Sequence, residues 1–155
     1  MLVVDTSAIL EALAAKSPAP GLVERLAGDG DLHAPHLIDV ELLHALRAMT
    51  IRREITSERA ADARSDFAEL GMVRYPHEPL SDRIWALRHN MSAYDAAFVA
   101  LAETLGTPLL TCDARVATAP GHHAKVELFT DATATRPAGA AKTPEDPPPT
   151  TQPGV

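Results

Sequence analysis

The sequence is poor in cysteine and in long apolar stretches, and both shortages exclude classes of protein. Its 155 residues include one cysteine, Cys112, so no disulfide can form within the chain, which suits a reducing compartment such as the cytoplasm. No stretch approaches the roughly 18 consecutive apolar residues that a membrane helix needs. The first residues lack a basic segment and carry Asp5 in their apolar run, which favours a strand over a signal peptide. We expect a cytoplasmic protein without a membrane span.

Positive charge is also in short supply. The chain has 14 Lys and Arg against 21 Asp and Glu, a formal net charge of −7. Such a chain has no overall basic field to attract nucleic acid, which argues against a protein that coats DNA or RNA. The deficit weighs less against a nuclease, because bound cations offset part of the charge of an acidic site.

The order of apolar patterns predicts one α/β domain with a parallel sheet, because short apolar runs alternate with longer helical periodicities. The expected strands are 2–5, 31–35, 72–76, 108–112 and 126–130. The expected helices are 7–16, 20–28, 37–53, 56–71, 81–90 and 93–105. We place the domain at 1–133. Residues 134–155 are rich in Pro, Ala and Thr without apolar periodicity, so we predict a disordered tail.

Several helix ends and one helix face follow from local chemistry. Hydroxyl residues are expected to cap three helices: Thr6 or Ser7, Thr56 or Ser57, and Ser81. Gly106 is expected to end the helix 93–105. In the helix 37–53 the apolar side is expected to carry Leu37, Val40, Leu43 and Leu46–Ala48.

Four acidic residues stand where they can meet at one edge of the sheet. These four acids are Asp5, Glu41, Asp95 and Asp113. The first and last each follow a short apolar run, where a parallel strand would end, and the other two lie on expected helices. Clustered carboxylates repel one another unless a cation joins them, and oxygen ligands suit Mg²⁺ or Mn²⁺ better than Zn²⁺. The sequence therefore predicts a divalent metal site that can activate water and stabilise a phosphoryl transition state.

Neighbouring residues add support to this site. Hydroxyls at Thr6, Ser7 and Thr111 flank the acids and could hold metal-bound waters or a phosphate oxygen. Arg115 follows Asp113 closely and is the best candidate for contact with a phosphate backbone.

Other polar residues fit structural roles better. His33, His36 and His44 lack a recognised zinc-ligand spacing, and Cys112 has no evident histidine base. Asp39 is two residues from Glu41 and therefore points to a different face of the helix.

Three segments together carry a resemblance to a known family. They are VVDTSA, then Pro35, Leu37 and Glu41 in the pattern P-x-L-x-x-x-E, then AYDAAFVALAETLGTPLLTCDARV. From residue 1 to about 130 the chain resembles the PIN domain of VapC-type toxins, the ribonuclease halves of type II toxin–antitoxin modules, and residues 93–116 are the most specific part. The resemblance implies a three-layer α/β/α sandwich with a five-stranded parallel sheet and Mg²⁺-dependent endoribonuclease activity.

The resemblance also assigns roles and partners. It implies that the four acids form the active site, with Asp5 and Asp95 as principal metal ligands and with Ser7 and Thr111 as supporting hydroxyls. Some members carry a further acid where this chain has Val116, so a second metal would bind weakly or only with RNA present. The expected partners are RNA, a VapB-like antitoxin whose C-terminal segment covers the active-site groove, and a second copy of the chain.

Three other classes of protein share parts of this acidic edge. A phosphoacceptor receiver domain needs an acidic pair directly after the first strand, but Thr6 and Ser7 follow Asp5. A haloacid-dehalogenase-type phosphatase needs D-x-D there, and Ser7 takes the place of the second Asp. A PIN-like scaffold that binds a partner without catalysis is the strongest alternative of a different class, and the intact set of four acids argues against it.

Overall fold

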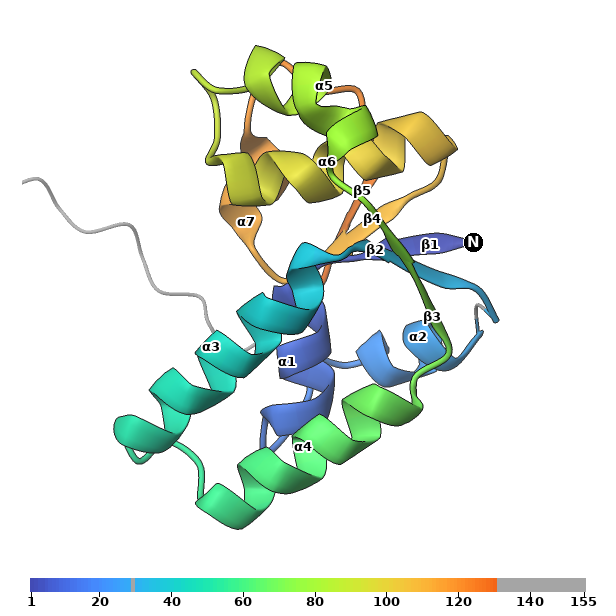
Figure 1. The fold of residues 1–155 in the computed structure, drawn as a ribbon. Helices are drawn as coiled ribbons and strands as arrows, with labels where there is room; N and C mark the ends of the chain where they lie inside the picture. The colour runs from blue at the N-terminus through green and yellow to red at the C-terminus, as the bar shows by residue number, and fades with distance from the viewer. Residues whose placement is uncertain (29, 131–155) are drawn as a thin grey trace, which may run out of the picture.

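A five-stranded parallel sheet forms the centre of the molecule. A computed structural model describes residues 1–28 and 30–130, so the predicted tail 134–155 and the predicted boundary at 133 lie outside the described residues. The strands are β1 (Leu2–Val4), β2 (Leu32–Pro35), β3 (Met72–Tyr75), β4 (Leu109–Thr111) and β5 (Val126–Leu128). Their order across the sheet is β3-β2-β1-β4-β5, and every neighbouring pair is parallel (Figure 1). The predicted α/β class and all five strands are confirmed.

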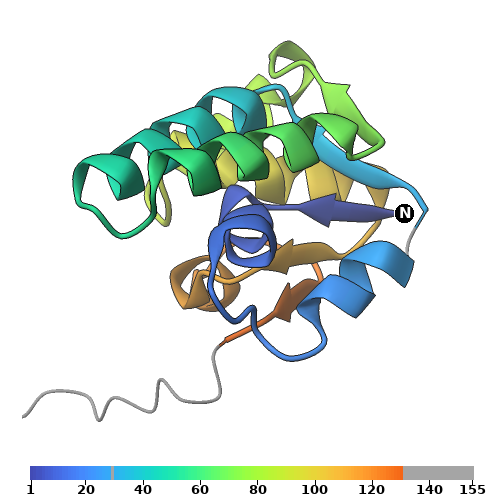
Figure 2. The same ribbon diagram turned by 90° about the horizontal axis from the view of Figure 1, so that it is seen from below.

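Helices cover both faces of the sheet. They are α1 (Thr6–Ala14), α2 (Leu22–Gly28), α3 (Leu37–Ile51), α4 (Ser57–Glu69), the 3₁₀ turn η1 (Glu78–Leu80), α5 (Ser81–Ala86), α6 (Ala93–Leu105) and α7 (Ala114–Thr118). In Figure 1, α1 to α4 lie on one side of the sheet and α5 and α6 on the other, which gives the expected three layers. Figure 2 shows α3 and α4 running side by side. None of the helices in the described ranges is long and apolar enough to span a membrane.

The core lies where α6 crosses the middle of the sheet. Every residue of β1 and β4 is buried, as is the run 96–102 in α6. Strands buried on both faces have near-continuous apolar sequences, as LVV does here. This explains why the central strands could be recognised from short runs of sequence.

The order of strands reverses beside β1, and this places the predicted site. The chain passes from β1 to β2 and β3 on one side and later returns to β4 and β5 on the other. Val4 is in register with Leu110, so Asp5 and Thr111 follow side by side at the carboxyl edge. Ligands of open parallel sheets bind at such a reversal.

Helix ends agree with the sequence in part. Thr56 caps α4 by accepting a hydrogen bond from the Arg59 amide, and Gly106 ends α6 in a left-handed conformation, both as predicted. The prediction for α1 is wrong, because the hydroxyls of Thr6 and Ser7 bond to carboxylates and Asp5 stands at the N-cap.

The second half of the chain departs further from the expected helices. Ser81 does not cap α5, since its hydroxyl donates to the Glu78 carbonyl and it is already helical. The expected helix 81–90 ends at Ala86. The short α7 was not foreseen.

The predicted apolar face of α3 is right for Leu46, which is buried, and for Leu37, which packs against the core, but wrong for Val40 and Leu43. Ile38, Leu42 and Leu46 are the buried residues, whereas Val40 is 65% exposed and Leu43 is 50% exposed. The helix has apolar residues on more than one side, so periodicity alone could not decide which side meets the sheet.

Candidate active site

Asp5 is the most tightly held of the four acids. Its Oδ2 accepts hydrogen bonds from the hydroxyls of Ser7, at 2.7 Å, and Thr111, at 2.6 Å. The two hydroxyl oxygens lie 3.1 Å apart, and Ser7 Oγ also accepts from the Cys112 amide. Two segments that are distant in sequence, 5–7 and 111–112, therefore fix one carboxylate at the end of β1.

The environment of Asp5 disfavours the charged form of its carboxyl group. Burial raises the pKa of the Asp5 carboxyl, the hydroxyls of Ser7 and Thr111 lower it, and the negative charge of Asp95 raises it again. Desolvation has the largest effect, so the net direction is upward. A cation beside this carboxylate would relieve both the burial and the repulsion.

Glu41 reaches the same place from α3. Its Oε2 accepts a hydrogen bond of 2.6 Å from Thr6 Oγ1 at the start of α1. Burial raises the pKa of the Glu41 carboxyl, the Thr6 hydroxyl lowers it, and the charges of Asp5 and Asp95 raise it. The structure therefore brings Asp5, Glu41 and Asp95 within each other's electrostatic reach.

Asp95 enters from the first turn of α6. Ser92 caps this helix by accepting a 3.1 Å hydrogen bond from the Asp95 amide, and its hydroxyl donates to Asp95 Oδ2 at 2.7 Å. This reciprocal pair fixes the start of α6 and the direction of the carboxylate together. Ser92 was not singled out in the sequence, although its spacing of three residues before an acid is the signal of such a cap.

Asp113 differs from the other three because a cation of the chain itself holds it. The Arg115 guanidinium donates to both of its carboxylate oxygens, with Nη2 at 2.6 Å from Oδ2 and Nε at 3.1 Å from each oxygen. These hydrogen bonds hold the pKa of the Asp113 carboxyl below its usual range. The carboxylate also accepts the Arg115 amide at the start of α7.

The donor chemistry of the site fits a hard divalent cation. Three carboxylates that repel one another and three hydroxyls offer only oxygen donors. Mg²⁺ and Mn²⁺ prefer such a set of ligands. Within residues 1–28 and 30–130, no three Asp, Glu, His or Cys side chains close into a ready-made cation cage. Asp5, Glu41 and Asp95 are thus electrostatically coupled but do not close around one point.

The histidines and the cysteine have other roles. His33 is buried in β2 and its Nδ1 lies 2.9 Å from the Tyr75 hydroxyl. His36 packs edge-on against the ring of His77. Cys112 is half-buried rather than fully buried. Within the described ranges, these histidines therefore form no cluster that could bind zinc.

Residues of β3 and the loop after it hold the helix that carries Glu41. The His77 Nε2 atom accepts a 3.2 Å hydrogen bond from the Leu37 amide at the start of α3. Arg74 pairs with both oxygens of Asp39, at 2.8 and 2.9 Å. Asp39 therefore points away from Glu41, as predicted, but its arginine partner lies 35 residues away and was not foreseen.

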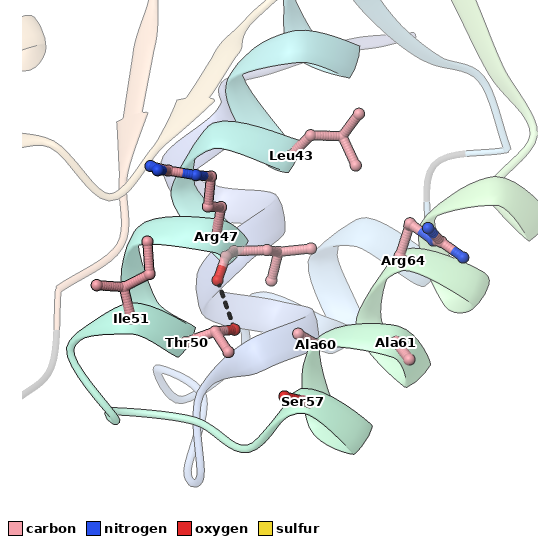
Figure 3. Close-up of a pocket in the computed structure, with 9 residues that line it drawn as sticks. Leu43, Arg47, Thr50, Ile51, Ser57, Ala60, Ala61 and Arg64 are labelled. Carbon is pink, nitrogen blue, oxygen red and sulfur yellow. Dashed lines mark hydrogen bonds between the residues drawn. The ribbon is translucent and has the colours of Figure 1, made fainter.

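A separate apolar groove lies between α3 and α4. It has a volume of about 350 Å³, and the nine residues that line it are Leu43, Leu46, Arg47, Thr50, Ile51, Ser57, Ala60, Ala61 and Arg64. Figure 3 shows Leu43, Arg47 and Ile51 on α3 and Arg64 on α4. This α3–α4 groove contains none of the four acids and offers apolar surface with two arginines.

Comparison with known proteins finds relatives over most of the chain. Residues 2–121 match the PIN domain family. The chain is 43% identical over 127 residues to Ribonuclease VapC1 of Mycobacterium tuberculosis strain H37Rv, with 81% of this chain and 96% of that protein covered. It is 38% identical over 128 residues to Ribonuclease VapC12 of the same strain, with 83% and 98% covered.

Solved structures show the same fold. The crystal structure of PAE2754 from Pyrobaculum aerophilum matches with a TM-score of 0.57 at 23% identity, covering 81% of this chain and 82% of that one. The crystal structure of Mycobacterium tuberculosis VapC20, a toxin that cleaves the sarcin-ricin loop, matches with a TM-score of 0.56 at 17% identity, covering 79% and 97%. At these identities the likeness concerns the fold alone.

Proposed function

Because the chain belongs to the PIN domain family and, within it, to the VapC ribonucleases, we propose that it is the toxin of a toxin–antitoxin module. Its reaction is the Mg²⁺-dependent hydrolysis of RNA phosphodiester bonds in the cytoplasm, and Mn²⁺ can substitute. One observation carries this proposal. Asp5, Glu41 and Asp95 come from three different parts of the fold, and their like charges repel one another near the strand-order reversal.

Asp5 and Asp95 are the principal ligands in this mechanism, and Glu41 and Asp113 complete the cation site. The bound Mg²⁺ would lower the pKa of a water and stabilise charge on the phosphoryl group in the transition state. Ser7 and Thr111 keep the Asp5 carboxylate in one rotation by donating to the same oxygen. Such fixed donors reduce the reorganisation needed during the reaction.

Glu41 orients the attacking water in this proposal. Its raised pKa comes from burial and from the neighbouring acids, which makes it a better proton acceptor than an exposed glutamate. Thr6 holds one oxygen of this carboxylate and so sets the direction of the other. Arg115, whose side chain is 89% exposed at the rim, is the proposed contact with the RNA backbone.

The decisive experiment is RNA cleavage by the purified protein, freed of any bound antitoxin. Total cellular RNA is incubated with Mg²⁺ or with chelator, and new 5′ ends are mapped. We expect discrete products only with the cation. Asp5→Asn and Asp95→Asn should each lower the rate at least about a hundredfold, because each removes a charged ligand of a cation worth several kcal/mol.

Asp62→Asn is the matched control, because Asp62 is an exposed acid on α4. This variant should cleave RNA at the parental rate. Parental cleavage by Asp5→Asn or Asp95→Asn would contradict the mechanism. Absence of any Mg²⁺-dependent product would favour the non-catalytic scaffold, and turnover of small phosphomonoesters instead of RNA would favour a different metal-dependent phosphohydrolase.

The partner in this proposal is a VapB-like antitoxin. The resemblance implies that its C-terminal segment covers the active-site groove, and we assign the α3–α4 groove to an apolar part of the same antitoxin. Leu43 and Ile51 are 50% and 62% exposed there, and contiguous exposed apolar surface often marks an interaction site. Arg47 and Arg64 flank the apolar floor, so the surface suits an apolar segment with acidic neighbours. The chain is also expected to form a homodimer, which light scattering of the free protein tests directly.

A further inference from the structure

Arg115 and Asp113 form a pair whose two members have very different exposure. The Arg115 side chain is 89% exposed, while that of Asp113 is 22% exposed. Two nitrogens of the guanidinium contact both carboxylate oxygens, so this cation occupies the edge of Asp113 that a divalent cation would use to contact both oxygens at once. The fourth acid is therefore neutralised by the chain itself.

The same arginine also faces the rest of the site. The negative charge of Asp95 raises the pKa of Arg115, although Asp113 contributes more. The guanidinium therefore pairs with Asp113, the N-cap residue of α7, within electrostatic range of Asp95 on α6. An RNA backbone that approaches the acids would meet this exposed guanidinium at the rim.

Phosphate can compete for the arginine at little cost. Exposed ion pairs contribute only about 0.2–1 kcal/mol, and a phosphate offers the same two-oxygen geometry as a carboxylate. A guanidinium that pairs with phosphate leaves Asp113 uncompensated beside three other acids. That carboxylate then becomes a better ligand for a divalent cation.

We propose that Arg115 is a latch on Asp113 that an RNA phosphate opens. Without RNA, the guanidinium pairs with Asp113 and withholds it from the cation; with RNA, the guanidinium turns to the backbone and Asp113 joins the site. The inference rests on the proposed function for the identity of the polyanion. Because linkage is reciprocal, RNA and the cation each strengthen the binding of the other through this one residue.

The test is a double-mutant cycle on cation affinity, read by electron paramagnetic resonance of Mn²⁺ rather than by cleavage. The variants are Arg115→Met, Asp113→Asn and the double variant. Asn keeps the cap of α7, and circular dichroism checks that each variant folds. Without RNA, Arg115→Met should tighten Mn²⁺ binding about fivefold, the lower end of typical couplings. In the Asp113→Asn background, Arg115→Met should change Mn²⁺ affinity less than about twofold, because the carboxylate that pairs with the arginine is absent.

A charge control and an RNA arm complete the design. Arg59→Met removes the same charge from α4, outside the acidic site and the α3–α4 groove, and should leave Mn²⁺ affinity unchanged. A phosphorothioate single-stranded RNA, which resists hydrolysis, should tighten Mn²⁺ binding more in the parent than in Arg115→Met.

If Arg115→Met tightened Mn²⁺ binding equally with and without the Asp113 carboxylate, the effect would be one of general charge and the latch would be overturned. No tightening of Mn²⁺ binding in either background would also overturn it. Equal gains from the RNA in parent and variant would also overturn it. The Mn²⁺ cycle needs no turnover. A positive cycle without RNA cleavage would therefore refute the proposed function alone, and cleavage with a flat cycle would refute the latch alone.

Discussion

Asp5 is a carboxylate whose ionisation opposes folding. Burial raises its pKa above the ordinary value of 3.8, so in the folded protein it holds its proton to higher pH than in the unfolded chain. Stability then falls as pH rises through that window, because the folded state binds more protons there. Above the window the cost is present in full.

Asp5→Asn should therefore stabilise the cation-free protein at pH 7 by on the order of 1 kcal/mol. The amide oxygen of Asn can still accept the hydroxyls of Ser7 and Thr111. Thermal unfolding with chelator should show a rise in Tm of about 4 °C. The gain should shrink toward zero as pH falls below 3.8, where the Asp5 carboxyl is protonated even in the unfolded chain.

Asp62→Asn supplies the comparison for this measurement, because that acid is exposed and should change Tm little at either pH. A lower Tm for Asp5→Asn at pH 7 would mean that the charged carboxylate stabilises the fold, contrary to its raised pKa. In excess Mg²⁺ the parent should have a higher Tm than Asp5→Asn, because only the parent keeps the Asp5 carboxylate as a cation ligand.

At this scale the sequence could predict positions but not partners. Asp5 and Thr111 were predictable as neighbours because each ends a buried run and the strands are parallel. The bond from Thr6 to Glu41 joins residues 35 apart, and no local pattern marks it. The pairing of Arg115 with Asp113 depends on the short α7, which is too brief for periodicity to reveal.

The element that matters most for the site is α3, since it brings Glu41 to the strand edge. Its N-cap residue, His36, makes no capping bond with its side chain, and His77 supplies an acceptor to the Leu37 amide instead. The start of α3 is therefore held from the loop after β3, the edge strand.

Replacing His77 by Ala should cost about 1 kcal/mol, the usual loss when a helix start loses a side-chain acceptor. His77→Gln should recover most of this, because the Gln amide oxygen can reach the place of Nε2. Chemical denaturation at neutral pH measures both. If Gln and Ala lost the same stability, the hydrogen bond to Leu37 would not be the cause, and packing against His36 would be.

Elements followed the sequence where periodicity and capping agreed. The helix α6 begins at Ala93 and ends at Leu105 as predicted, since a buried apolar run lies between Ser92 and a left-handed Gly106. The face of α3 was misjudged because packing against α1 and α4 selected Ile38 and Leu42 over Val40 and Leu43. Tertiary contact decided what periodicity left open.

The whole molecule separates two surfaces. The acidic edge gathers carboxylates at the ends of β1 and β4 and at the starts of α1, α6 and α7, whereas the α3–α4 groove presents exposed leucine and isoleucine with arginines. With a net charge of −7, the protein has few places that favour a polyanion. RNA should therefore bind through local contacts such as Arg115, and a partner with an apolar segment through the groove.

Charge placed in the groove should weaken the antitoxin complex without weakening the fold. We expect Leu43→Asp and Ile51→Asp each to lower affinity for the co-expressed antitoxin at least about tenfold, because each puts a carboxylate against an apolar partner. Val73→Asp is the control, since Val73 on the edge strand β3 is 48% exposed, close to the 50% of Leu43, but lies outside the groove. Isothermal titration of the purified pair measures the affinities, and unfolding curves confirm that each variant folds. Parental affinity in both groove variants would place the antitoxin elsewhere, and an equal loss in Val73→Asp would show that the added charge acts without regard to position.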